Sequence, residues 1–163
     1  MSFNYNGLMM IKKIDIDELW DKAQSDPNHD LELDYAKENF YQRNEDEIFS
    51  AFNRSVIERQ SELESLPPSL FIFYFPFFNR FILAGKHLNE DLDDIVSCYL
   101  TLVDNKLDSG ELDLNLVDDT EKAVNYLYIN IHKYNRSPEI YGDLREKAAL
   151  IKSKLVLYES KVK

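Results

Sequence analysis

Turn-forming residues are scarce in this 163-residue sequence, which has four glycines and five prolines. Average usage would supply about 12% of these two residue types together, roughly twice as many. Because turns between short strands usually draw on glycine or proline, the sequence can make few of them. This shortage favours long helices over a sheet of many short strands.

Cysteine is represented by Cys98 alone, so the chain cannot form an internal disulfide. The chain also does not open with a charged segment followed by an apolar one, as a secretory signal would. We therefore expect a cytoplasmic protein. Cys98 lies on an apolar stretch with no basic neighbour, which predicts an inert, packed thiol rather than a nucleophile.

Motifs for catalysis and metal binding are missing. His29, His87 and His132 are far apart and show none of the close spacings that mark a metal site. The sequence has no glycine-rich phosphate loop and no Gly-x-Ser-x-Gly motif. We predict no catalytic residue, no cofactor and no metal. An enzyme whose site is assembled from residues dispersed in the sequence is still an alternative. A pocket that holds a histidine against a buried carboxylate would indicate it.

Only one long apolar run occurs, the aromatic segment from Leu70 to Ala84. A membrane-spanning helix needs about 20 mainly apolar residues, whereas this run is shorter and contains Pro76, Asn79 and Arg80. We expect no membrane span. Its phenylalanines are predicted to form core, since a domain of this size needs that burial; a hydrophobic docking face is the alternative.

Apolar residues recur at helical spacing through most of the chain. Asn44 with Glu47, and Asp118 with Glu121, have the spacing of capping boxes. The segment 107–116 is predicted to be a loop, although its alternating leucines also allow a short strand. Gly142 weakens the start of the last helix, and Asp143 can restart it. We expect helices over residues 16–23, 31–43, 44–66, 70–84, 89–106, 118–134 and 137–163.

These patterns predict an all-α protein, an irregular bundle of six or seven helices that forms a single domain over residues 1–163. Residues 1–10 are predicted to be a weakly ordered extension. A stack of helical hairpins is the structural alternative, although no repeat of fixed period is visible.

The formal charge of −11 is unevenly distributed along the sequence. Residues 89–121 contain eleven acids and one lysine, whereas residues 122–163 contain nine bases and four acids. A buried, unpaired carboxylate is costly, so we expect these acids to face away from the apolar helix stripe and to form one negative surface. The predicted partner-binding residues are Glu90, Asp91, Asp93, Asp94, Asp108, Glu111, Asp113, Asp118 and Asp119.

A surface of this kind would attract a basic protein and repel nucleic acid and membrane phosphate. The leading hypothesis is a non-catalytic binding or inhibitory protein with a basic protein partner. A helical adaptor that binds through an apolar groove beside the aromatic segment is the alternative. It also remains open that the acids only maintain solubility, cap helices and pair with the basic C-terminal helix.

In size, acidity, helical pattern and lack of catalytic motifs, the sequence resembles the immunity proteins that neutralise bacterial polymorphic and contact-dependent growth-inhibition toxins. The resemblance is one of general character and assigns no residue roles. It implies a cytoplasmic complex with a cognate toxin, such as a nuclease whose active site is basic because its substrate is RNA or DNA. Inhibition would then depend on charge complementarity and fast association.

Overall fold

The computed structural model describes residues 16–87 and 92–162. These residues form ten helices, eight of them seven residues or longer, and no strand. The predicted all-α bundle is confirmed, while the predicted extension over residues 1–10 lies outside the described residues. The first helix covers residues 16–25. The others are α2 (Leu31–Phe40), α3 (Glu45–Arg54), α4 (Val56–Ser65), α5 (Pro68–Ala84), α6 (Leu92–Asp108), α7 (Leu114–Ile129), α8 (Ile131–Tyr134), α9 (Pro138–Tyr141) and α10 (Leu144–Val162).

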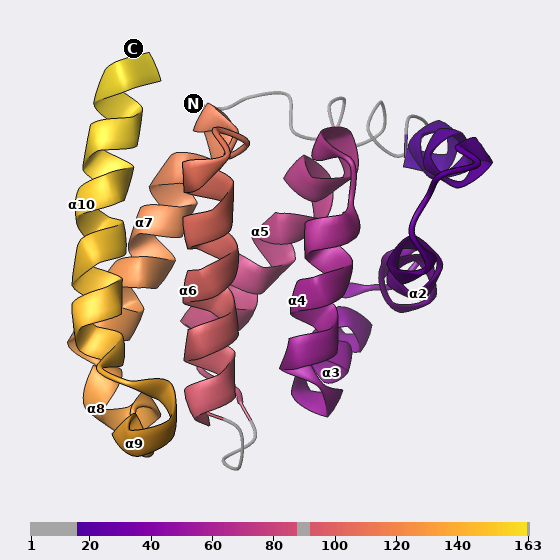
Figure 1. The fold of residues 1–163 in the computed structure, drawn as a ribbon. Coiled ribbons are helices and arrows are strands. Elements are labelled where there is room, and N and C mark those ends of the chain that lie inside the picture. Colours follow the sequence, from indigo (N-terminus) through magenta and orange to yellow (C-terminus); the bar gives the residue numbers. More distant parts are fainter. Residues whose placement is uncertain (1–15, 88–91, 163) are drawn as a thin grey trace, which may run out of the picture.

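The longer helices are arranged in two layers (Figure 1). Helices α2, α4, α6 and α10 lie side by side in one layer, and each contacts the next. Helices α3, α5 and α7 form the second layer behind them. Consecutive long helices therefore alternate between the layers, which buries one face of each helix. Helix α10 lies at one edge of this arrangement and α2 near the other.

The segment predicted as one helix over residues 44–66 is two helices, α3 and α4. Its start is as predicted, because Asn44 and Glu47 form the capping box through hydrogen bonds of 2.9 and 3.1 Å. The break is at Ser55, whose backbone is extended and whose hydroxyl caps α4. The buried Arg59 donates to the Ala51 carbonyl (3.1 Å), so an acceptor near the break is satisfied.

The segment predicted as a loop over residues 107–116 is shorter than expected. Helix α6 continues to Asp108, and α7 already begins at Leu114. Asp113 caps α7 by accepting from the Asn115 backbone N–H at 2.8 Å. The predicted capping box of Asp118 and Glu121 is therefore wrong, since both residues lie inside α7. Leu116 is buried at the first turn, which explains the early start.

The start of the last helix follows the predicted pattern. Helix α9 ends at Gly142, which has a positive φ of 75°, a conformation that favours glycine. The Asp143 carboxylate then accepts from the backbone N–H groups of Arg145 and Glu146 at 3.0 and 3.1 Å. This is the restart expected at Asp143.

The aromatic helix α5 runs through the core and confirms the prediction for this segment. Its buried rings pack on those of neighbouring helices, as Phe78 does on Phe52 and Tyr99. Asn79, one of the polar residues that interrupt the apolar run, is 2% exposed and joins a buried network by accepting from the Tyr99 hydroxyl and donating to Thr120. No helix in the described part is long and apolar enough to cross a membrane.

Candidate binding surface

Helix α6 divides the predicted partner-binding residues into two groups. Asp93 and Asp94 lie in its first turn, and Asp108 is its last residue. At 1.5 Å per residue these positions are about 20 Å apart along the helix axis. Figure 1 shows the two ends of α6 at opposite ends of the bundle. Glu90 and Asp91 lie outside the described residues.

Asp93 contradicts the expectation that every acid of this segment faces solvent. Its side chain is buried, with 9% of the residue exposed. The carboxylate accepts a hydrogen bond of 2.8 Å from the Ser137 backbone N–H, just before α9. A buried carboxylate is tolerated where a donor satisfies it. The prediction was wrong because the partner of Asp93 is Ser137, 44 residues later in the chain, and a local sequence pattern does not reveal so distant a contact.

Asp94 is half-buried and also makes a structural contact at this end of α6. Its carboxylate accepts from the hydroxyl of Tyr141, the last residue of α9. That hydrogen bond to a negative group raises the pKa of Tyr141 to about 12. Asp93 and Asp94 therefore hold the α9 segment against α6, and neither side chain is displayed as a free acid.

The other predicted acids meet at the opposite end of the bundle. There the end of α6, the start of α7 and the end of α10 lie together (Figure 1). The Tyr158 hydroxyl of α10 donates to the Leu112 carbonyl at 2.6 Å, which joins α10 to the α6–α7 connection. We call this region the acidic end. Its members are Asp104, Asp108, Glu111, Asp113, Asp118, Asp119, Glu121 and Glu159.

Lysines are paired with four of these acids. Lys154 Nζ of α10 lies 2.6 Å from Asp104 and 3.1 Å from Asp108. These hydrogen bonds, with Asp104 the larger cause, raise the pKa of Lys154. Lys106 Nζ lies 3.8 Å from a Glu111 carboxylate oxygen, and Lys122 Nζ lies 3.6 Å from an Asp119 carboxylate oxygen. Pairing with the basic last helix, left open by the sequence, is thus present for Asp104 and Asp108.

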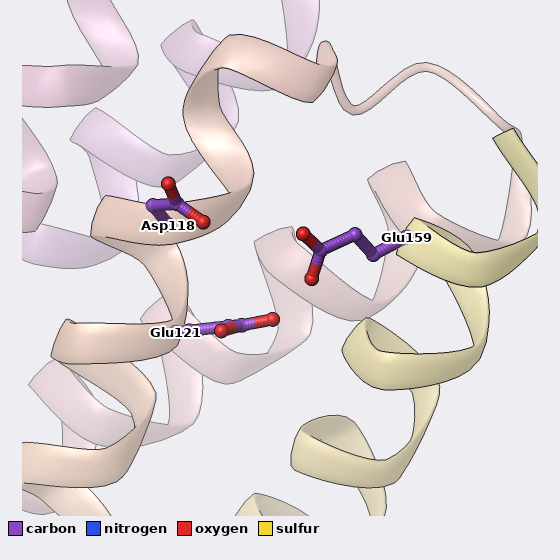
Figure 2. Close-up of side chains that lie close together, drawn as sticks. All are labelled: Asp118, Glu121 and Glu159. Atoms are coloured by element: carbon purple, nitrogen blue, oxygen red, sulfur yellow. The ribbon is translucent and has the colours of Figure 1, made fainter. Parts of the chain in front are cut away.

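Asp118, Glu121 and Glu159 form the most concentrated part of the acidic end. One carboxylate oxygen from each lies within 4.8 Å of the others. Figure 2 shows Glu159 pointing from α10 toward Asp118 and Glu121 on α7. Three carboxylates at this separation can accept from a cationic side chain or ligate a hard divalent ion. Glu159 was not predicted from the sequence because it lies in the basic segment, residues 122–163.

A groove of about 440 Å³ lies beside this cluster, between α7 and α10. Asp118 and Glu121 line it together with Lys122, Lys152 and Val156. Lys152 Nζ is held 3.0 Å from the Asn125 side chain and 4.4 Å from the centre of the Tyr128 ring. The groove thus combines two carboxylates, two ammonium groups and one exposed aliphatic side chain.

A dispersed acid–base site would place a histidine against a buried carboxylate in a pocket, and neither His29 nor His87 is in such a position. His29 lines a pocket of about 420 Å³, but its partner Asp34 has a 41% exposed side chain. His87 packs on Phe81 and lies 3.0 Å from the Tyr134 hydroxyl. Burial lowers the pKa of His87 to about 4, so its imidazole is neutral near pH 7. Among the described residues, neither histidine faces a buried carboxylate.

The thiol of Cys98 is buried, as predicted. Burial, with a smaller contribution from Asp94, raises its pKa to about 12. A thiol in this environment is protonated near pH 7 and is a poor nucleophile.

No family model, curated protein sequence or solved structure matches this chain. The geometry of its own residues therefore carries the functional argument.

Proposed function

We propose that this chain is a non-catalytic binding protein whose acidic end contacts a basic protein partner. In its specific form, the proposal is an immunity protein that neutralises a basic, nuclease-type bacterial toxin in the cytoplasm. The observation that carries it is the convergence of acids from α6, α7 and α10 at one end of the bundle.

The convergence supports binding because the acids outnumber the cations around them. Lys106, Lys122 and Lys154 form ion pairs at this end and Lys152 lines the adjoining groove, whereas the acidic end has eight carboxylates. The field of such a surface accelerates the approach of a basic partner. It also keeps nucleic acid away, which suits an inhibitor that covers a nucleic-acid site.

The position of the cluster on helices also supports the proposal. Asp118 and Glu121 are fixed on α7, and Glu159 on α10, which packs directly on α7. A partner's lysine or arginine would meet carboxylates whose backbone is already ordered. Less conformational entropy is then lost on binding than with a flexible acidic loop.

The adaptor alternative requires an accessible groove beside the aromatic segment. Most of the large rings of α5 are instead buried, among them Phe71, Phe75 and Phe78. One described pocket reaches α5 at Ser69, and none of those described is lined by an aromatic residue of α5. The acidic end is therefore the better supported surface.

The test is affinity capture from the native cell extract with the full chain immobilised. We expect a basic protein whose association slows strongly when salt is raised from about 50 to 300 mM, because screening removes electrostatic steering. Neutralising the acidic end with Asp118→Asn, Asp119→Asn, Glu121→Gln and Glu159→Gln should weaken capture at least tenfold. Mass spectrometry identifies the partner, and surface plasmon resonance measures the rates.

A matched control separates the acidic end from total charge. The variant Glu18→Gln, Asp21→Asn, Glu38→Gln and Asp46→Asn removes the same charge from exposed positions on the first helix, α2 and α3. We expect it to bind almost as tightly as the wild type. Equal losses in both variants, or capture that survives neutralisation of the acidic end, would contradict the proposal.

A further inference from the structure

The outer face of α10 carries no charge over three turns. Its buried face packs on α6 and α7 through Leu144, Ala148, Ile151 and Leu155. Residues on the opposite side share one face by helical spacing. They form what we call the α10 stripe, which consists of Ala149, Leu150, Ser153, Val156, Leu157 and Ser160.

Three large aliphatic side chains of the α10 stripe are exposed to solvent. Leu150, Val156 and Leu157 are 54%, 61% and 60% exposed. Helix α10 also lies at the edge of the two-layer arrangement (Figure 1). The terminal element of a layered helical stack normally has a polar outer face. An apolar stripe at this position indicates that a further helix packs there.

We propose that the α10 stripe pairs with the same stripe of a second copy of this chain, in an antiparallel arrangement about a two-fold axis. The axis passes between Ser153 and Lys154, so that Leu150 of each copy faces Leu157 of the other. Ser153 and Ala149 are small and let the two helices approach closely. Such an interface is isologous and closes at a dimer.

Charge at the two ends of the stripe selects this partner and this direction. Glu146 and Lys161 are exposed and lie at equal distances, about 11 Å, from the midpoint of Leu150 and Leu157. In the antiparallel pair, Glu146 of each copy faces Lys161 of the other. In a parallel pair Glu146 would face Glu146, and Lys161 would face Lys161, which costs energy.

Lys154 lies beside the axis, where two copies would bring like charges together. Its ammonium group, however, is bound by Asp104 and Asp108 of its own chain, at 2.6 and 3.1 Å. These two carboxylates offset the charge of Lys154 and draw it toward α6. The centre of the stripe can therefore be covered without an uncompensated cation.

The first test is sedimentation velocity of the full chain over a concentration series. A small apolar interface predicts a reversible dimer with a dissociation constant on the order of 10 μM. Leu157→Lys should weaken it at least tenfold. The control Leu31→Lys changes another exposed leucine (63% exposed) on α2 and should leave it unchanged. Circular dichroism checks that each variant is folded.

The second test uses charge exchange between copies. Glu146→Lys and Lys161→Glu should each weaken self-association by roughly three- to tenfold, because like charges then meet twice in each dimer. An equal mixture of the two variants should associate as well as the wild type, since both contacts become complementary again. In a parallel pair, either single change would only exchange one like-charge contact for another and would not weaken association further, so the loss in each single variant distinguishes the two directions.

A chain that stays monomeric up to several hundred micromolar would overturn the proposal, as would a dimer that Leu157→Lys leaves intact. Failure of the mixture to associate would overturn the antiparallel arrangement. The proposal does not depend on the acidic end binding a partner, because the outcomes are measured on the isolated chain.

Discussion

The two ends of α6 carry similar acidic residues, but these residues differ in burial and in the partners they bind. At its start, Asp93 is buried against the Ser137 backbone and Asp94 accepts from Tyr141. At its end, Asp108 is exposed and shares Lys154 with Asp104. Local composition is alike at both ends, and the difference comes from which distant segment packs there. A run of acids in a sequence therefore does not by itself predict an exposed acidic surface, because exposure depends on which distant segments pack against it.

The largest effect on stability is expected when the buried acid at the start of α6 is removed. Asp93→Ala should lower the free energy of unfolding by about 2 kcal/mol, because the Ser137 N–H then loses a charged acceptor in a buried position. The same change at Asp118, which is exposed, should alter it by less than about 0.5 kcal/mol. Urea unfolding followed by circular dichroism measures both. Equal effects at the two positions would erase the distinction between the ends.

The start of α6 should also be the end that responds to acid, because His87 packs there on Tyr134 of α8. Burial lowers the pKa of His87 to about 4, whereas an unfolded imidazole titrates near 6.5. The unfolded state therefore binds the proton first as pH falls. The stability contributed by neutral His87 is complete above about pH 6.5 and is lost progressively toward pH 4.

We expect this loss to be about 1–2 kcal/mol between pH 7 and 4.5, after allowance for the partial exposure of His87. His87→Gln should reduce the difference in unfolding free energy between these two pH values by that amount. The matched control His132→Gln changes an exposed histidine and should reproduce the wild-type pH dependence. A wild-type profile in the His87→Gln variant would disprove the assignment.

The smallest effect is expected at the other end of α6. Converting Asp118, Glu121 and Glu159 to their amides relieves repulsion among three nearby carboxylates. Stability should stay within about 0.5 kcal/mol of the wild type, with any change a gain that shrinks as salt is added. Thermal melts at low and high salt measure it. A large loss would mean that this cluster has a structural role like that of Asp93.

The fold could be predicted from the sequence wherever the pattern is local. The stripe of Leu92, Ile95, Val96 and Tyr99 is buried as expected, because helical periodicity depends only on neighbours along the chain. The break at Ser55 was not predicted, since it depends on how α3 and α4 pack and on the buried Arg59. Tertiary packing overrode a continuous apolar pattern there.

The candidate surface could be predicted less completely. Asp108, Glu111, Asp113, Asp118 and Asp119 do belong to one end of the bundle, as their closeness in sequence suggests. Glu159 was missed and Asp93 was misplaced, because both depend on contacts between segments more than 35 residues apart.

Acidity is also not confined to the middle of the chain. Residues 16–65 hold fourteen acids and five bases. Some of these side chains surround a polar pocket of about 490 Å³ between α2 and α4, where Arg59 and Glu62 form a buried ion pair at 2.8 Å. Desolvation raises the pKa of Glu62 despite that pair. The protein therefore has two acidic regions, residues 16–65 and residues 89–121, and the contrast between the ends of α6 applies to the second.

The hydrogen bonds among Asn79, Tyr99 and Thr120 have a consequence for the uniqueness of the core. Rings from α5 and its neighbours are mutually similar in shape, so several rotational settings of these helices would bury nearly the same area. The observed setting also brings the Asn79 amide within hydrogen-bond distance of the Tyr99 phenol and the Thr120 hydroxyl. If one of these helices rotated by one residue position, buried polar groups would lose their hydrogen-bond partners. The network therefore favours a single packing of an otherwise apolar core.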